Sequence, residues 1–126
     1  MTNTLNVYWR HQKGQHFEDS ALQFLQARNM QLVERNYRCR LGEIDLVVHD
    51  GATLVFVEVR YRRSNSHGPA FATVDARKQH KIRNAARHFL HRYKQYGNCV
   101  CRFDVMGIEA DSAGKPRIQW IPNAFY

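Results

Sequence analysis

The chain has 126 residues, of which 44% are hydrophobic and 24% are charged, which is typical of one globular domain and excludes a disordered tail, a collagen and a pure coiled coil. No apolar run approaches the roughly 18 residues of a membrane span, and the first residues lack the apolar core of a secretion signal. Lys and Arg number 19 against 11 Asp and Glu, a net charge of +8, which favours a polyanionic partner, above all nucleic acid, over a membrane surface.

Residues 1–13 are polar with scattered aromatic side chains, and we expect a flexible arm ahead of a single domain over residues 14–126. From Gly14 to about Arg28 the apolar residues are spaced by four, three and one positions, which predicts a helix with one apolar face. This face consists of Phe17, Ala21, Phe24 and Leu25. Asn29 is suited to cap the end of the helix.

Three strands are predicted next, over Leu32 to about Arg38, residues 43–49 and residues 53–60. The first is ended by Leu41-Gly42. Between the other two, Asp50-Gly51 is the strongest hairpin signal in the chain and predicts a two-residue turn. Residues 64–70 are rich in turn formers and predict a loop.

A long helix is predicted from about Asp75 to Tyr96, because apolar residues recur at three- and four-residue steps. Its stripe consists of Ile82, Ala85, Ala86, Phe89, Leu90 and Tyr93. Thr73 or Asp75 could cap its start, and Gly97-Asn98 should end it. Two more strands are predicted over residues 100–109 and 117–121. The order α-β-β-β-α-β-β predicts an α/β sandwich, with a mixed central β-sheet flanked by helices.

Two acidic residues interrupt the strands of the predicted hairpin. Glu58 lies between Val57 and Val59 in an apolar strand, where a lone carboxylate is costly unless it is paired or binds a metal. Asp45 interrupts the preceding strand in the same way. With a two-residue turn at Asp50-Gly51, the two acids lie on one face as diagonal neighbours, about 7–8 Å apart; a four-residue loop keeps this arrangement and a three-residue loop destroys it.

Two carboxylates at this spacing could bind one cation, and oxygen ligands with free water positions suit Mg²⁺ or Mn²⁺. The alternative is a structural role, in which Glu58 forms a core ion pair with Arg60 or another strand arginine. Two acids on adjacent strands of a basic protein favour the metal site.

These residues also carry a resemblance. The segments GEIDLVV at 42–48 and VFVEVRYR at 55–62 resemble the split acidic motif of the restriction-endonuclease-like, or PD-(D/E)xK, nucleases. The whole chain resembles the small uncharacterised bacterial YraN-type family, whose motifs it carries in order: Glu18, Asn36-Tyr37-Arg38, Gly42 to Asp45, Phe56 to Arg62, Lys78-Gln79, Arg102 to Val105 and Asn123-Ala124-Phe125. The resemblance implies a restriction-endonuclease-like sandwich similar to archaeal Holliday-junction resolvases.

The resemblance implies Asp45 and Glu58 as metal ligands, with Glu18 as an additional acid from the first helix. The nuclease motif has a lysine two residues after the second acid, where this chain has Arg60. Arginine supplies positive charge but does not accept a proton. Three interpretations stay open: Arg60 supports catalysis electrostatically, Lys78 takes the role of the motif lysine, or the site is inactive and DNA binding remains. Gln79 could orient substrate or a helix end.

Five basic residues are expected to contact backbone phosphates, namely Arg62, Arg63, Lys81, Arg83 and Arg87, although a solvated helix face explains about half of them equally well. The three cysteines cannot all pair within one chain, so we expect structural thiols and a reducing, cytoplasmic location.

The sequence thus predicts a DNA-binding protein that hydrolyses phosphodiesters in structured, branched or single-stranded DNA with Mg²⁺ or Mn²⁺. One alternative is a catalytically inactive nuclease-fold module for DNA binding or assembly, and another is an enzyme acting on RNA. Paired cuts in a branched substrate would require a homodimer, for which the sequence identifies no interface.

Overall fold

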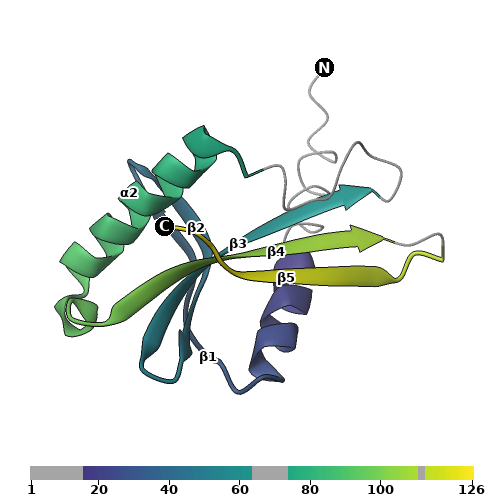
Figure 1. Ribbon diagram of the computed structural model, residues 1–126, viewed down its shortest axis with the longest axis horizontal. Coiled ribbons are helices and arrows are strands. Elements are labelled where there is room, and N and C mark those ends of the chain that lie inside the picture. The colour runs from purple at the N-terminus through teal and green to yellow at the C-terminus, as the bar shows by residue number, and fades with distance from the viewer. Residues whose placement is uncertain (1–15, 64–73, 111–112) are drawn as a thin grey trace.

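The computed structural model describes residues 16–63, 74–110 and 113–126. The arm expected over residues 1–13 and the loop expected over 64–70 lie outside these residues. An N-terminal helix covers residues 16–26, and the other elements (Figure 1) are β1 (Gln31–Cys39), β2 (Gly42–Asp50), β3 (Thr53–Arg63), α2 (Ala76–Arg92), the 3₁₀ turn η2 (Lys94–Tyr96), β4 (Val100–Ala110) and β5 (Pro116–Phe125). None of the described helices has the length and apolarity needed to cross a bilayer.

The strands form one mixed sheet in the order β1-β2-β3-β4-β5. Neighbouring strands are antiparallel except for β3 and β4, which are parallel and are joined by the connection that contains α2. The predicted element order and the mixed sheet are therefore confirmed.

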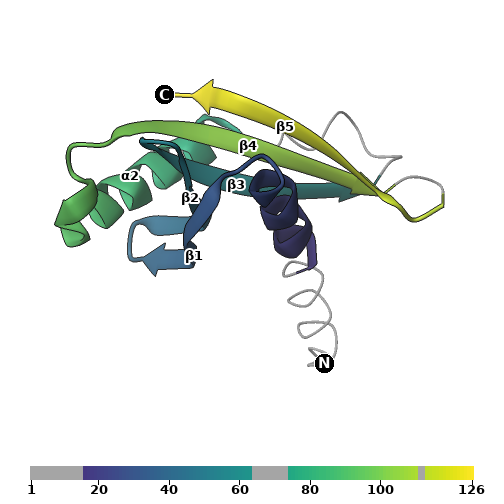
Figure 2. The same ribbon diagram turned by 90° about the horizontal axis from the view of Figure 1, so that it is seen from below.

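A helix packs on each face of the sheet (Figures 1 and 2). The N-terminal helix buries Ala21 and Leu25 in one core layer, with Met30, Leu46, Val48, Val55, Val57, Met106 and Ile108. The α2 helix contributes to the other layer, which contains Tyr37, Ile44, Val47, Leu54, Phe56, Ala85, Ala86 and Phe89. The alternation in β3 is as predicted, so that Glu58 follows Leu54 and Phe56 on the α2 face.

The ends of both helices follow from local residues. The carboxylate of Asp75 accepts a hydrogen bond from the backbone N–H of Lys78 at 2.9 Å, which caps α2. Asn29 has a φ of 67°, the left-handed conformation with which helices commonly end. Both residues are among those expected from the sequence.

Gly42 brings the β1–β2 turn against α2. A Cβ atom at this position would lie 2.8 Å from the backbone oxygen of Lys81, closer than non-bonded atoms can approach. Only glycine therefore allows the start of β2, three residues before Asp45, to lie this near α2.

Several predicted boundaries are wrong, among them the end of β3, which continues to Arg63 instead of ending at Arg60. Asp50 pairs with Thr53, so the hairpin turn consists of Gly51-Ala52, and Gly51 takes the left-handed φ of 60°. The α2 helix ends at Arg92 instead of near Tyr96, because the chain turns into the separate 3₁₀ turn η2. The last strand continues beyond Ile121 to Phe125.

Candidate metal centre

Asp45 and Glu58 lie where β2 and β3 separate. The ladder between these strands ends at the pair Leu46 and Val57, and Asp45 and Glu58 are the next residues along. The corrected turn therefore places the two acids opposite each other, closer than the diagonal arrangement predicted from a turn at Asp50-Gly51. The backbone N–H of Val59 donates to Oδ2 of Asp45 at 2.7 Å, so the Asp45 carboxylate takes over a hydrogen bond of the interrupted ladder.

The separation begins with a reversal of β2. Ile44 packs in the core layer on α2, whereas Leu46, two residues later, packs in the layer on the N-terminal helix. Side chains two apart in a regular strand share a face, so the strand rotates at Asp45. Asn36 lies across from Asp45 on β1, between the paired residues on either side, and has a left-handed φ of 55°, which rotates β1 at the same point.

Glu58 is almost completely buried, with 3% of its surface exposed. Its Oε1 lies 3.5 Å from Nη1 of Arg60 and 3.5 Å from Nζ of Lys78. Its Oε2 is also buried and has no hydrogen-bond partner among the described residues. The core ion pair with Arg60 considered above is thus present, but it satisfies only one of the two oxygens.

A second buried carboxylate shows what a purely structural acid looks like here. Asp104 is fully buried and accepts four hydrogen bonds, from Nε and Nη2 of Arg102 at 3.0 and 3.2 Å, Nε1 of Trp120 at 2.9 Å and the N–H of Asn123 at 2.9 Å. Arg102 also donates to Asp50 at 2.8 Å. Buried charges are normally compensated in this way. The buried Oε2 of Glu58 accepts from no donor of this kind, and Glu58 instead faces the Asp45 carboxyl, with which it can share a hydrogen bond when one of the two acids is protonated.

The surroundings disfavour two negative charges at the pair. Burial, followed by the negative charge of Asp45, raises the pKa of Glu58 to about 8. Burial also raises the pKa of Asp45, although the N–H of Val59 acts in the opposite direction. A divalent cation between the two carboxylates would remove this penalty.

Glu18 approaches from the N-terminal helix. Its Oε1 lies 3.9 Å from Nε of Arg35 and has no hydrogen-bond partner in the described part of the chain. Burial and then the charge of Asp45 raise the pKa of Glu18, which places it near the pair. Yet no three Asp, Glu, His or Cys side chains among the described residues converge closely enough to hold one metal ion. The candidate ligands are therefore limited to Asp45 and Glu58, a small set of the kind that Mg²⁺ would complete with water and substrate oxygens.

Basic side chains surround this pair. Two hollows meet at Lys78 and Lys81: one is also lined by Arg60, Asp75 and Arg77, and the other by Arg38, Cys39, Gly42 and Glu43. Lys78 precedes the buried Ile82 by four residues and lies on the inward side of α2, where its Nζ faces Glu58. Arg38 and Arg77 were missed, although Arg77 directly precedes Lys78 and Arg38 ends the Asn36-Tyr37-Arg38 motif.

The other candidate residues lie outside these hollows. Gln79 donates to the carbonyl of Val74 at 3.2 Å and so serves the start of α2. Arg83 donates to the Tyr126 carbonyl at 2.8 Å and Arg87 to the side chain of Asn84 at 3.3 Å; at about 100° per residue, both lie on the side of α2 opposite Lys78. Arg62 lies four residues beyond Glu58 on β3, and the side chain of Arg63 is outside the described atoms.

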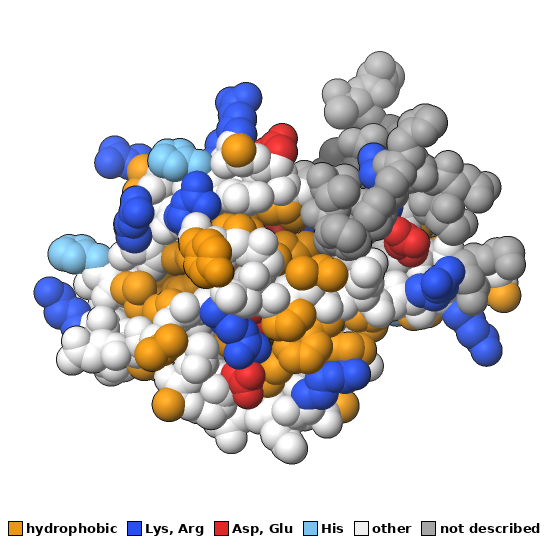
Figure 3. Space-filling view, viewed as in Figure 1, with side chains coloured by type: hydrophobic (Ala, Val, Ile, Leu, Met, Phe, Trp, Pro, Cys, Tyr) orange, Lys and Arg blue, Asp and Glu red, His pale blue; other side chains and the backbone are white. Residues whose placement is uncertain are grey.

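On the face seen in Figure 3, the charged side chains do not identify one binding surface. On the side seen in Figure 3, Lys and Arg side chains lie at several separate places, including the region over α2, and do not merge into one patch. The basic residues that matter for the candidate site are therefore defined by their distance from Glu58, and not by the net charge of +8.

Comparison with known proteins shows the family. A family model described as "Uncharacterised protein family UPF0102" matches residues 17–108. The chain belongs to this family. Among its UPF0102 relatives, a protein of Aeromonas hydrophila subsp. hydrophila is 55% identical over 117 residues, which cover 90% of this chain and 84% of the relative. A protein of Alcanivorax borkumensis is 49% identical over 113 residues, which cover 90% of this chain and 90% of the relative. A protein of Pseudomonas syringae pv. syringae is 47% identical over 116 residues, which cover 92% of this chain and 94% of the relative.

The UPF0102 match extends over the whole candidate centre, from Glu18 through Asp45 and Glu58 to Lys78. The bacterial YraN-type family inferred from the motifs is thereby confirmed. In chemical terms, the centre combines two buried carboxylates with an arginine and a lysine from two different elements, an arrangement that can bind a divalent cation and, beside it, a phosphate.

Proposed function

We propose that this UPF0102 protein is a metal-dependent endonuclease that hydrolyses DNA phosphodiesters, with Mg²⁺ or Mn²⁺ held by Asp45 and Glu58. The unpartnered, buried Oε2 of Glu58 opposite Asp45 carries the proposal. The mixed sheet covered by one helix on each face, with the acids on its central hairpin, supports a restriction-endonuclease-like sandwich as the finer description of the fold.

Each residue of the centre has a role in this proposal. When bound, a divalent cation neutralises charge on the phosphate and activates a water nucleophile. Asp45 and Glu58 provide its anionic ligands, and Glu18 acts more remotely, through solvent. Arg60 and Lys78 hold the phosphate and stabilise the negative charge that grows during attack. Lys78 supplies from α2 the ammonium group that the nuclease motif has at the position of Arg60, since both cations lie 3.5 Å from the same oxygen of Glu58.

The second candidate function is a nuclease-fold module that binds DNA without cutting it. The observation in its favour is Arg60, whose guanidinium holds Glu58 Oε1 in an ion pair and cannot accept a proton. RNA offers the same phosphates and stays an alternative substrate, and a homodimer stays a prediction for paired cuts.

Calorimetric titration of Mg²⁺ and Mn²⁺ tests the centre. We expect binding by the wild type and by Glu34→Gln, an acid on β1 outside the hollows, and no binding by Asp45→Asn/Glu58→Gln. Asparagine is preferred to alanine at position 45 because the side chain accepts the Val59 N–H. Equal metal binding by the double variant would refute the centre.

Cleavage of labelled branched and linear DNA, with RNA in parallel, tests the activity. Lys78→Ala should lower the rate by about 10²–10³, the usual effect of removing one group that stabilises transition-state charge, whereas Arg87→Ala on the opposite side of α2 should not. Metal and salt-dependent DNA binding without any cleavage would favour the non-catalytic module.

A further inference from the structure

The β1–β2 turn and α2 meet beside the acid pair. A Cβ atom at Gly42 would lie 2.8 Å from the backbone oxygen of Lys81 and 3.4 Å from its Cβ atom, so the turn directly contacts this part of the helix. Burial and then the negative charge of Glu43, which follows Gly42, raise the pKa of Asp45. The junction of the turn and the helix therefore lies next to the candidate metal centre.

A hollow of about 330 Å³ lies at this junction. It is lined by Arg38, Cys39, Gly42, Glu43, Lys78 and Lys81. Lys78 and Lys81 also line the neighbouring hollow that contains Arg60, and Nζ of Lys78 lies 3.5 Å from Oε1 of Glu58. The two hollows thus share two lysines, one of which contacts the proposed metal ligand.

Positive charge exceeds negative charge in the hollow at the junction, where three of the six lining residues are basic and one, Glu43, is acidic. Lys81 is exposed and makes no ion pair with the residues that the structure describes. Nε of Arg38 lies 3.4 Å from Oε2 of Glu43, but both side chains are more than half exposed, and exposed ion pairs are weak. This contact uses one of the three guanidinium nitrogens, so Arg38 and Lys81 can both bind an anion.

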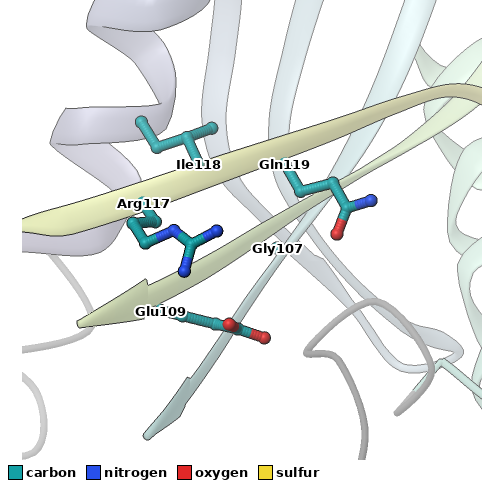
Figure 4. Close-up of a pocket in the computed structure, with 5 residues that line it drawn as sticks. All are labelled: Gly107, Glu109, Arg117, Ile118 and Gln119. Atoms are coloured by element: carbon teal, nitrogen blue, oxygen red, sulfur yellow. The ribbon is translucent and has the colours of Figure 1, made fainter. Parts of the chain in front are cut away.

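The hollow on β4 and β5 has a similar volume of about 310 Å³ but no such excess of charge (Figure 4). Its one acid, Glu109, and its one base, Arg117, occupy paired positions of the two strands. The hollow at the junction therefore differs in its excess of positive charge and in its position beside Asp45.

The spacing of the two shared lysines suits neighbouring phosphates. Lys78 and Lys81 are three residues apart on α2, which places their Cβ atoms about 5–6 Å from each other. Adjacent phosphates of a nucleic-acid strand are joined by one sugar and are separated by a similar distance. A strand whose reacting phosphate lies at Lys78 can thus bring its next phosphate to Lys81.

We propose that Lys81 and Arg38 bind a second phosphate, which neighbours the phosphate cut at Asp45 and Glu58 in the same strand. A lysine and an arginine from two elements supply charge-assisted hydrogen bonds to the phosphate oxygens. The substrate is therefore a strand that continues past the cut with a phosphate on that side, and an ester without this phosphate binds more weakly. This inference rests on the proposed function, of which it specifies the substrate.

Calorimetric titration with thymidine 3′,5′-bisphosphate, and with the 3′- and 5′-monophosphates, tests the second site. None of the three contains a diester, so saturating Mg²⁺ can be present without cleavage. The wild type should bind the bisphosphate about tenfold more tightly than either monophosphate. Lys81→Ala should remove this advantage, because one hydrogen bond between charged groups accounts for about a tenfold change, and should leave binding of the monophosphates and of Mg²⁺ unchanged.

The matched control is Lys94→Ala, because Lys94 is also an exposed lysine but lies in η2, beyond the far end of α2. It should bind all three nucleotides as the wild type does. Removing Arg38 alone would leave the charge of Glu43 uncompensated, so Arg38→Ala/Glu43→Gln is compared with Glu43→Gln. The double variant should lose the preference for the bisphosphate, whereas Glu43→Gln should keep it.

The outcomes separate this site from the metal centre. Equal binding of the bisphosphate and the monophosphates by the wild type refutes the second site and leaves cleavage at Asp45 and Glu58 standing. Equal losses for all three nucleotides in Lys81→Ala, or the same loss in Lys94→Ala, also refute the second site alone. Failure of the wild type to bind Mg²⁺ and all three nucleotides refutes both proposals. A loss confined to the bisphosphate in Lys81→Ala, and absent in Lys94→Ala, supports the second site.

Discussion

Replacing the buried carboxyl of Glu58 by an amide should stabilise the metal-free protein. Burial and Asp45 raise the pKa of Glu58 from 4.5 to about 8, so at neutral pH the native state retains a proton that the unfolded chain has released. Each pH unit above 4.5 costs about 1.4 kcal/mol of stability until the native group also ionises. Because the cost is shared with Asp45, we expect Glu58→Gln to be about 2–3 kcal/mol more stable than the wild type at pH 7.

The pH dependence has a definite sign. A raised native pKa gives a contribution to stability that is complete below the unfolded value of 4.5 and is lost as the pH rises through about 8. The free energy of unfolding of the wild type should therefore fall over this range more steeply than that of Glu58→Gln.

Urea unfolding in EDTA between pH 5 and 9, followed by circular dichroism, measures both effects. Adding Mg²⁺ at pH 8 should raise the stability of the wild type and leave Glu58→Gln unchanged, because only the native wild-type centre binds the ion. The half-buried Glu34 is the control, and Glu34→Gln should follow the wild-type curve. If Glu58→Gln is no more stable than the wild type and the two pH slopes coincide, the burial cost assigned to Glu58 is wrong.

Three further substitutions test the framework, each by urea unfolding. Asp104→Asn removes the charge that compensates Arg102 and should cost about 3–5 kcal/mol; a loss below 1 kcal/mol would contradict the buried network. Gly42→Ala places a Cβ atom against the Lys81 carbonyl and should cost about 1–3 kcal/mol, with weaker Mg²⁺ binding as α2 shifts; unchanged stability would show that the turn yields freely. Asp75→Ala removes the cap of α2 and should cost about 1 kcal/mol, whereas Asp75→Asn should retain most of it.

The element order and the identity of the acid pair could be predicted because both depend on local pattern. The valines of β3 mark one buried face, so Glu58 is visible as the residue that breaks the other. The prediction that Asp45 and Glu58 share a face of the sheet is correct although the predicted turn is wrong. Shifting the turn from Asp50-Gly51 to Gly51-Ala52 moves the register by two residues, which leaves both side chains on the same face. The same shift changed the pair from diagonal to opposite, which a dipeptide preference could not determine.

The rest of the centre depends on contacts between distant residues. The β2 pattern does not predict that the strand rotates at Asp45, because the rotation is visible only once Ile44 and Leu46 are seen to pack on opposite sides of the sheet. The helical spacing places Lys78 on the inward side of α2, but only the packed helix shows that Lys78 and Arg60 meet at one oxygen. Arg83 was assigned to phosphate contacts by charge alone, whereas it binds the carbonyl of Tyr126.

The hydrogen bond from Val59 to Asp45 bears on how relatives of this protein should be compared. Asp45 completes the backbone of β3, so folding alone gives a reason to keep it, even in a descendant that has lost all chemistry. Glu58 makes no comparable backbone contact. Its Oε1 faces Arg60 and Lys78, but its buried Oε2 accepts no hydrogen bond among the described residues, so burying this side chain costs stability in the metal-free protein. Under the proposed function, an aligned relative with the aspartate but a hydrophobic residue in place of the glutamate should neither bind the metal ion nor cleave DNA. Retention of the glutamate is the more informative sign of a working site.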